Sequence, residues 1–178
     1  MQCYKLSYFL GIINNIDKKT IRPIMKTIAL IVAAGRGTRA GGEIPKQYEM
    51  CNKTRMLSLT MRALLQSSRI DALVVVINPL DIKLYEDCLK DVNDPRILQY
   101  CFGGTERSES VGKGLNKLKE YEPKKVLIHD AARPFIHLEL IDRILDSLNS
   151  NQAVLPVMPI VDAIWEKNSN GSNQHLMP

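Results

Sequence analysis

Residues 28–47 read Ile-Ala-Leu-Ile-Val-Ala-Ala-Gly-Arg-Gly-Thr-Arg-Ala-Gly-Gly-Glu-Ile-Pro-Lys-Gln, an apolar run that passes directly into a glycine-rich turn. The run from Ile28 to Val32 is typical of a buried strand. A strand that ends in small residues can present several backbone N–H groups to an anion, and Gly35 and Gly37 permit close approach because they lack a Cβ atom. The stretch therefore predicts a phosphate-binding loop at the end of a strand.

Two cations, Arg39 and Lys46, follow this turn. The turn lacks the Gly-Lys-Ser/Thr of a Walker loop and the glycine spacing of a dinucleotide fingerprint. Pro45 restrains the backbone beside Lys46, which favours a fixed lysine over an ordinary surface cation. Fixed cations can stabilise the charge that develops when a phosphoanhydride breaks, so the loop suits a triphosphate that is held and cleaved.

The composition is that of a globular chain of about one domain. Hydrophobic residues make up 45% and charged residues 24% of the 178 residues, which favours neither disorder nor a membrane protein. The formal net charge is +5, but Lys and Arg are scattered with few aromatic residues between them. An anionic small molecule is therefore favoured over nucleic acid as the partner. The four cysteines show no metal-binding spacing, which indicates reduced thiols and a cytoplasmic protein.

We expect residues 1–24 to be a poorly ordered extension and residues 25–178 to form the folded domain, with Met25 as an alternative start. Short β-branched runs alternate with helical periods, as in a parallel sheet covered by crossover helices. The expected fold class is α/β, a Rossmann-like three-layer arrangement with a mostly parallel sheet. The expected strands are 28–34, 72–78, 97–101, 125–129 and 153–159, and the expected helices include 57–65, 82–89, 111–118 and 141–148.

Ligands of an open α/β sheet bind beyond the carboxyl ends of its strands, which directs attention to His129 and the residues after it. Asp130, at the tip of a strand and among small residues, is suited to Mg²⁺, which bridges carboxylates to phosphate oxygens. Arg133 could bind a second phosphate bidentately. The alternative for Asp130 is a cap on a helix beginning near Pro134. We expect His129 to pack at the strand end.

A third candidate site begins at Gly103 and Gly104, whose backbone a ligand can approach closely. Ser110 lies at the start of a helix, where its hydroxyl and nearby amides could hold a base or ribose. The alternative is that Ser110 only caps the helix. Glu106 and Arg107 are expected to pair with each other or with neighbours, and no chemistry is assigned to them.

Three motifs together resemble the 2-C-methyl-D-erythritol 4-phosphate cytidylyltransferase family. They are Ala33-Ala34-Gly35-x-Gly-x-Arg39 with Pro45-Lys46-Gln47-Tyr48, Gly103-Gly104-x-x-Arg107-x-x-Ser110-Val111, and His129-Asp130-Ala131-Ala132-Arg133-Pro134. The first motif alone occurs in many sugar-nucleotide pyrophosphorylases, whereas the three in this order and spacing are specific. They cover about residues 26–163.

The resemblance implies that CTP and 2-C-methyl-D-erythritol 4-phosphate react to give 4-diphosphocytidyl-2-C-methyl-D-erythritol and pyrophosphate, in non-mevalonate isoprenoid synthesis. It implies that Arg39 and Lys46 are catalytic, that Asp130 binds Mg²⁺, and that Asp130 and Arg133 lie at the substrate side. It also implies a homodimer that exchanges a β-arm after the fifth strand. The residues implied to bind the nucleotide are Ala33, Ala34, Gly35, Arg36, Gly37, Arg39, Lys46, Gly103, Gly104 and Ser110.

The chain departs from the family pattern in two ways. The family has Asp-Thr after the fifth strand, with the Thr near the acceptor, whereas this chain has Asp162 and Ala163. Asp162 either faces the site or caps a loop. The family domain also continues beyond Pro178. We therefore expect a domain incomplete at its C-terminus, with weak CTP–Mg²⁺ binding, poor or no turnover and an incomplete dimer interface. A fusion to a downstream cyclase stays open.

Two alternatives remain. Ribitol 5-phosphate cytidylyltransferase shares the three motifs but tends to carry a bulkier residue at the position of Ala132, so the alanine pair favours methylerythritol phosphate. An inactive nucleotide-binding fragment is supported by Ala163 and the early end of the chain. The intact Arg39, Lys46 and Asp130 argue against such a fragment.

Overall fold

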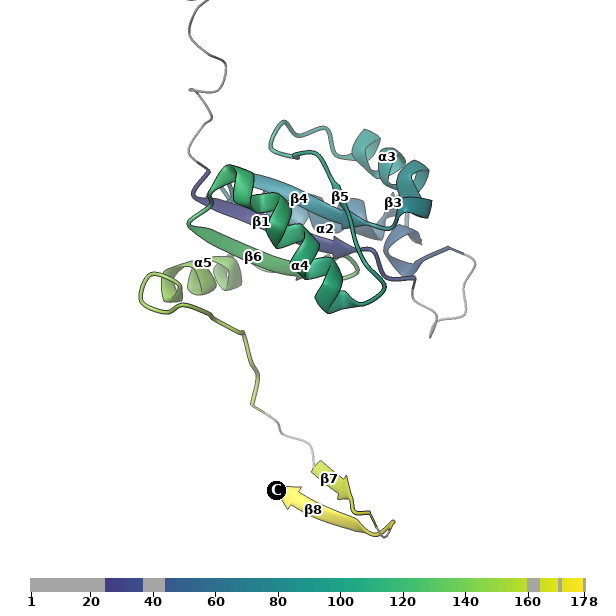
Figure 1. Cartoon of the computed structure of the whole chain (residues 1–178), viewed down its shortest axis with the longest axis vertical. Coiled ribbons are helices and arrows are strands. Elements are labelled where there is room, and N and C mark those ends of the chain that lie inside the picture. Colours follow the sequence, from purple (N-terminus) through teal and green to yellow (C-terminus); the bar gives the residue numbers. More distant parts are fainter. Residues whose placement is uncertain (1–24, 37–43, 160–163, 170, 178) are drawn as a thin grey trace, which may run out of the picture. The chain divides into compact units, whose positions relative to one another are not determined.

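The computed structural model describes residues 25–36, 44–159, 164–169 and 171–177, so the expected extension 1–24 lies outside the described residues. The chain divides into two units, Met1–Arg143 and Ile144–Pro178. The first unit contains a four-stranded parallel sheet in the order β5-β4-β1-β6 (Figure 1). Its strands are β1 Thr27–Ala33, β4 Ala72–Ile77, β5 Cys101–Phe102 and β6 Lys125–Asp130. The α/β class and the parallel sheet are therefore confirmed.

The helices follow from the order in which the chain visits these strands. From β1 the chain moves outward to β4 and β5 and then returns to β6. Because parallel crossovers are right-handed, the helices of the outward path and the returning helix cover opposite faces of the sheet (Figure 1). They are α2 Met56–Leu65 and α3 Ile82–Asp91 on the outward path and α4 Arg107–Leu118 on the return, followed along the chain by α5 Leu138–Ser147; the short 3-10 turns are η2 Lys46–Tyr48, η3 Pro79–Asp81 and η4 Lys119–Tyr121.

The core lies on both faces of the two central strands. Every residue of β4 is buried, and β1 is buried except for the half-buried Val32. Strands that are covered on both faces are continuously apolar, which is why these runs lack alternation. On one face α4 approaches closely, because Gly114 lies against Leu30 and Val76.

Two expectations for individual strands need correction. The run 97–101 forms only an isolated bridge between Ile97 and Leu73 and then the short strand β5. The expected strand 153–159 is wrong, because this segment has no regular structure in the described part of the chain. Pro156 and Pro159 interrupt it, and proline cannot donate to a strand ladder. Its large apolar side chains, such as Met158, are exposed.

Antiparallel hairpins were not predicted. One joins β2 Met50–Cys51 to β3 Thr54–Arg55, within the first unit. The second unit contains another, which joins β7 Ile164–Lys167 to β8 Asn173–Met177. Gly171 in its turn has φ of 84°, a conformation that glycine adopts without strain.

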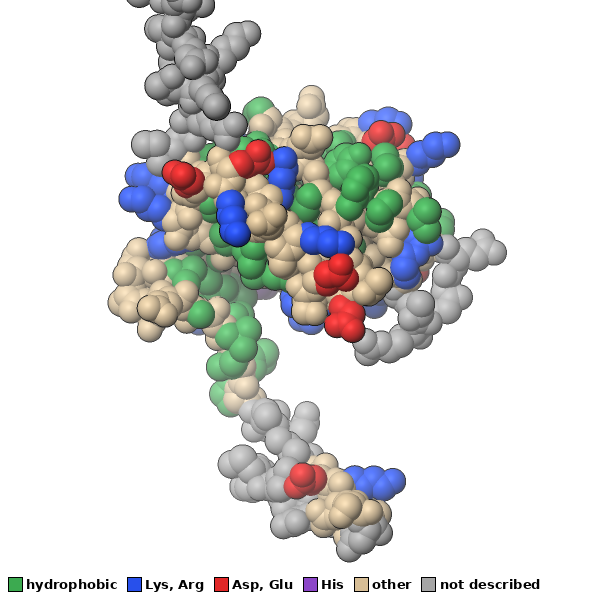
Figure 2. Space-filling model, viewed as in Figure 1, with side chains coloured by type: hydrophobic (Ala, Val, Ile, Leu, Met, Phe, Trp, Pro, Cys, Tyr) green, Lys and Arg blue, Asp and Glu red, His purple; other side chains and the backbone are tan. Residues whose placement is uncertain are grey.

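Charges of both signs are interspersed on the face of the first unit that carries α4 (Figure 2). Within α4, Lys113 Nζ lies 2.9 Å from Glu109 Oε1. At the end of α4, Lys117 Nζ lies 2.6 Å from Glu120 Oε1. Across the described residues, the helices are too short or too polar to span a membrane.

Candidate functional site

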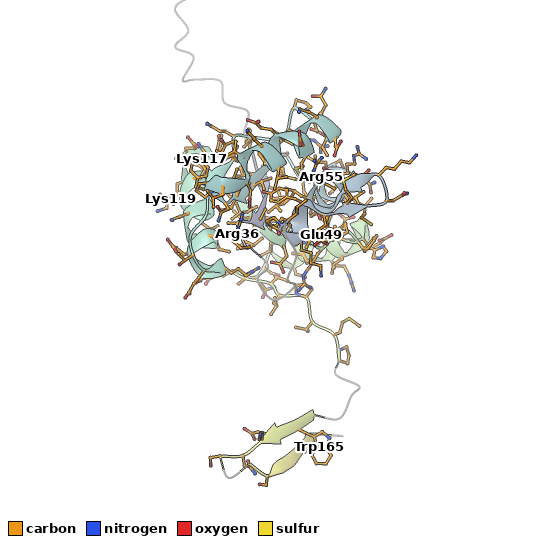
Figure 3. All side chains as sticks on the ribbon, turned by 90° about the vertical axis from the view of Figure 1, so that its right-hand side faces the viewer. Arg36, Glu49, Arg55, Lys117, Lys119 and Trp165 are labelled. Atoms are coloured by element: carbon orange, nitrogen blue, oxygen red, sulfur yellow. The ribbon has the colours of Figure 1, made fainter. Side chains whose placement is uncertain are left out.

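The three predicted loops gather at the carboxyl edge of the parallel sheet. The loop 34–36 follows β1, the loop 103–106 follows β5, and the loop 131–134 follows β6. The Gly103 N–H donates to Ile77 O at 2.9 Å, and the Ala131 N–H donates to Val32 O at 3.2 Å, so both loops continue the ladder beyond the strands. Figure 3 looks onto this side of the first unit, with Arg36 near the middle of the view.

Gly103 brings the loop after β5 into direct contact with the loop after β1. A Cβ atom at Gly103 would lie 2.3 Å from Ala34 Cβ and 2.7 Å from Ser110 Oγ, distances that no side chain tolerates. Glycine is therefore required there by close packing. The groups that approach Gly103 are parts of the protein itself, and the close approach of a ligand there stays a prediction.

Ser110 is only 2% exposed and lies inside α4 rather than at its cap, which is Glu106. Its hydroxyl oxygen accepts a hydrogen bond from the Gly104 N–H at 3.0 Å. The alternative that Ser110 caps the helix is therefore wrong. The Ser110 side chain instead fixes the turn at Gly103 and Gly104, and in the described part of the chain its own hydroxyl proton has no acceptor.

Glu109 reinforces the same turn. Its carboxylate accepts from the Thr105 N–H at 2.8 Å and forms an ion pair with Lys113 at 2.9 Å. The Lys113 ammonium and then the Thr105 hydrogen bonds lower the pKa of Glu109 to about 2.

Gln47 holds the first loop to η2. Its side-chain amide donates to Ala33 O and to Gly35 O, both at 2.7 Å, and the residue is 6% exposed. These two bonds fix the loop backbone relative to Lys46, which is exposed on η2. Gln47 was quoted in the sequence motif without a role. Its position beside Lys46 was the available signal.

Asp130 is bound by two arginines. Arg107 Nε and Nη2 donate to Oδ1 of Asp130 at 3.1 and 2.9 Å, and Arg133 Nε lies 3.0 Å from Oδ2. Burial raises the pKa of Asp130, but the hydrogen bond and charge of Arg107, followed by the charge of Arg133, outweigh it and hold the pKa below its usual value. Arg107 and Glu106 were expected to pair with each other or with neighbours, and the structure shows the second case for Arg107, whose hydrogen bonds to Asp130 tie the start of α4 to β6. The alternative of a helix cap is wrong, since α5 begins only at Leu138.

A model of the family described as 2-C-methyl-D-erythritol 4-phosphate cytidylyltransferase matches residues 27–175. The chain belongs to this family. The resemblance drawn from the three motifs is therefore confirmed.

Relatives of this cytidylyltransferase-family chain include much longer proteins. A bifunctional enzyme IspD/IspF of Brucella anthropi is 39% identical over 157 residues, which are 87% of this chain and 38% of that protein. Another, of Paramagnetospirillum magneticum, is 42% identical over 139 residues, 78% of this chain and 35% of that protein. The chain thus spans under two fifths of the length of these relatives.

Solved structures agree with this family membership. The 4-diphosphocytidyl-2C-methyl-D-erythritol synthase of Anaerococcus prevotii superposes with a TM-score of 0.70 at 25% identity, over 86% of this chain and 65% of that one. A further 4-diphosphocytidyl-2C-methyl-D-erythritol synthase gives a TM-score of 0.70 at 26% identity, over 86% and 68%. The nucleotidyltransferase fold is therefore confirmed.

At the carboxyl edge of the sheet, Asp130 is the predicted carboxylate ligand of a metal ion. The described ranges contain no group of three or more His, Cys, Asp or Glu side chains that could hold a metal ion. Mg²⁺ is commonly held by one or two carboxylates together with phosphate oxygens and water, so Asp130 fits the ion as part of a nucleotide complex. Both Asp130 oxygens accept from arginine, so the ion would share this carboxylate with the guanidinium groups or displace one of them.

His129 and Thr60 support the loop after β6. His129 Nε2 lies 2.8 Å from Arg133 O, which agrees with the expected place of His129 at the strand end. The buried Thr60 of α2, which sequence reasoning missed, donates to Ala131 O at 2.7 Å and supports the loop after β6. Gly37, Arg39 and Asp162 lie outside the described residues, as does Ala163, so their roles stay predictions.

Proposed function

We propose that the protein transfers a cytidylyl group from CTP to 2-C-methyl-D-erythritol 4-phosphate and releases pyrophosphate. The observation that carries this proposal is the convergence of the three family motifs at one edge of the sheet. Gly103 packs on Ala34, and Arg107 bonds Asp130, so residues far apart in the sequence share one site. The family membership supplies the substrates, and the geometry supports a single site for them.

The phosphate subsite would be built by the first loop. The backbone N–H groups at Gly35 and Arg36 lie at its exposed turn, and Lys46 is held nearby through Gln47. In the reaction an oxygen of the acceptor phosphate attacks the α-phosphorus of CTP, and the bond to the bridging oxygen of pyrophosphate breaks. Since the acceptor phosphate is already ionised, this step needs charge stabilisation more than a base. Lys46 and Arg39 would provide it.

The base and ribose subsite would lie at the loop after β5. The Gly104 backbone is held by Ser110 and the Thr105 backbone by Glu109, so the loop is preorganised. Preorganised donors lose less entropy on binding a ligand. The Ser110 hydroxyl proton would be available to an acceptor on the nucleotide once the loop admits it.

Asp130 and Arg133 would lie at the metal and acceptor side. When bound, Mg²⁺ would neutralise phosphate charge and hold the triphosphate in a fixed geometry. Asp130 is the carboxylate that would hold the ion. Arg107 and Arg133, which now bond Asp130, would then be available to phosphate oxygens, because guanidinium groups bind phosphate bidentately.

We also propose a cytoplasmic homodimer. The hairpin β7–β8 comes after the segment 153–159, where the resemblance places the family's β-arm. Its Trp165, labelled in Figure 3, is 62% exposed. An exposed tryptophan is enriched at protein interfaces. Cys51, Cys88 and Cys101 are free thiols, in keeping with a reducing compartment.

The direct test is an assay of pyrophosphate release from CTP with each of two acceptors, 2-C-methyl-D-erythritol 4-phosphate and ribitol 5-phosphate. We expect release with the first acceptor and none above background with the second. Equal release with both acceptors, or release with ribitol 5-phosphate alone, would assign the protein to the alternative acceptor. No release with either acceptor, from this chain and also from a chain extended beyond Pro178, would overturn the proposed activity.

A further inference from the structure

An ion pair with one buried member joins the loop 34–36, the proposed nucleotide loop, to the start of α3, which the family motifs do not include. Arg36 Nη1 bonds Oδ1 of Asp81, 45 residues away in the chain. Asp81 ends η3, immediately before α3 and beyond the carboxyl end of β4. Its side chain is 3% exposed, whereas that of Arg36 is 43% exposed. The pair therefore anchors an exposed loop residue to a buried carboxylate.

Asp81 depends on Arg36 as its charge partner, because its carboxylate is buried. Among the described residues, Oδ2 of Asp81 has no hydrogen-bond partner, and neither has the nearby hydroxyl of Tyr48. Burial, followed by the charge of Asp81, raises the pKa of Tyr48 above its ordinary value. A buried carboxylate without a charge partner is strongly unfavourable, so the bond from Arg36 compensates much of the cost of burying Asp81.

The pair acts on the same loop as Gln47, but from another side. The Gln47 side chain donates hydrogen bonds to the carbonyl oxygens of Ala33 and Gly35. Asp81 accepts a hydrogen bond from the side chain of the next residue, Arg36. Tyr48, which follows Gln47 in η2, lies close enough to Asp81 for its titration to respond to that charge. The loop backbone is therefore fixed by two anchors that both meet the segment carrying Lys46.

We propose that Asp81 is a positioning residue for the nucleotide loop. Through Arg36 it holds the loop in the conformation that directs the Gly35 and Arg36 N–H groups and the Lys46 ammonium at one triphosphate. The proposal rests on the proposed function, because it assumes that this loop binds the nucleotide. It also gives the Arg36 side chain an anchoring role, while the Arg36 backbone serves the phosphates.

The experiment compares Asp81→Asn, Arg36→Ala and the double variant with the unaltered protein. Hydrogen exchange of nucleotide-free protein would be followed in peptides covering residues 33–36 and 44–48, and kcat and KM for CTP would be measured on the same samples. Asp87→Asn is the matched control, because Asp87 lies on α3 and, among the described residues, pairs with Arg55 at 3.0 Å and Lys90 at 2.9 Å rather than with the loop.

We expect both single variants to accelerate exchange in these loop peptides and not in peptides of β4 or α4. Displacement of the loop should lower kcat/KM for CTP by about 10- to 100-fold. Because both changes break one interaction, the double variant should be no worse than the worse single variant. The Asp87→Asn control should match the unaltered protein in both measurements.

Unchanged loop exchange in Asp81→Asn and Arg36→Ala would overturn the proposal. Effects on kcat/KM that multiply in the double variant would also overturn it, since they would indicate that Arg36 contacts the nucleotide directly. If Asp81→Asn does not fold, Arg36→Ala at its exposed site decides the question by loop exchange alone. A failure of the proposed function would give a different result. The unaltered protein would not use CTP, while loop exchange would still respond to Asp81→Asn and Arg36→Ala.

Discussion

At the scale of single residues, the exposed cation Lys46 lies between tightly held neighbours. Pro45 and Gln47 are buried on either side of the exposed Lys46, and the Tyr48 N–H donates to Pro45 O at 2.7 Å. The backbone of Lys46 is therefore fixed although its side chain faces solvent. A positioned ammonium of this kind can stabilise developing charge without a cost of reorganisation.

Lys46→Ala should lower turnover far more than nucleotide binding. If Lys46 stabilises charge that develops in the transition state, kcat should fall by roughly 100- to 1000-fold, with less than about a tenfold change in affinity for CTP. Steady-state pyrophosphate release and calorimetric titration with CTP would measure the two effects. Lys53→Ala, at an exposed lysine in the β2–β3 turn, is the control. A variant that loses affinity and keeps kcat would show that Lys46 only binds the ground state.

Gln47→Ala should destabilise the fold, because it leaves two loop carbonyls without their donor. We expect a loss of about 1–3 kcal/mol in the free energy of unfolding. Urea denaturation would measure it, and Gln99→Ala at an exposed position should change stability by less than about 0.5 kcal/mol. Equal stabilities of the two variants would contradict a stabilising role for the two Gln47 hydrogen bonds.

The Glu109 interactions predict a dependence of stability on pH. The pKa of Glu109 is lowered from 4.5 to about 2 in the folded protein, so its ionised form is stabilised by folding. This contribution is fully present above pH 4.5 and is lost as the pH falls towards 2. Glu109→Gln should therefore lower Tm at pH 7, and the difference in Tm should close below pH 4.5. A difference that stays constant down to pH 3 would show that the carboxylate charge is not the cause.

At the scale of elements, the contact between α4 and the sheet depends on a missing side chain. A Cβ at Gly114 would lie 2.8 Å from Leu30 and Val76 methyl groups, whereas a Cβ at Gly112 would meet nothing within 4 Å. The two glycines therefore differ in packing although they lie on one helix.

Gly114→Ala should destabilise the protein by about 1–3 kcal/mol through overpacking, despite the better helix propensity of alanine. Gly112→Ala should stabilise it by roughly 0.4–1 kcal/mol, since only the propensity changes. Thermal or urea unfolding of both variants would measure the contrast. Stabilisation by both substitutions would mean that α4 does not pack as closely as described.

The elements also show how far the sequence could predict the structure. The buried runs of β1 and β4 and the stripe of α3 carry strong periodic signals, and they were predicted within a few residues. The hairpin β2–β3 has strands of two residues, too short for any period to appear. In 153–159 the apolar composition suggested a strand, but a strand needs a partner, and prolines limit which partner can pair with it.

The candidate site divides in the same way. Glycine, lysine and carboxylate positions followed strand ends, so the three loops could be predicted from local sequence and the rule for open α/β sheets. The partners of those residues could not. Asp81 lies 45 residues from Arg36, and Arg107 lies 23 residues from Asp130, and only the tertiary fold brings each pair together.

At the scale of the whole molecule, the strand order explains why one edge collects the site. The chain leaves β1 for β4 and β5 and returns on the other side of β1 to β6. The direction of winding therefore changes at β1, and such a switch point opens a crevice at the carboxyl end of the strand. The loop 33–36 begins at that point, which accounts for its central place among the three motifs.

The central claim is that this edge holds CTP, and a crystal structure of the protein with CTP bound would test it most directly. We predict triphosphate oxygens within hydrogen-bond distance of the Gly35 and Arg36 N–H groups and of Lys46 Nζ, with the cytosine beside the loop 103–110. Nucleotide bound at another part of the surface, with the Lys46 side chain directed into solvent, would contradict the account.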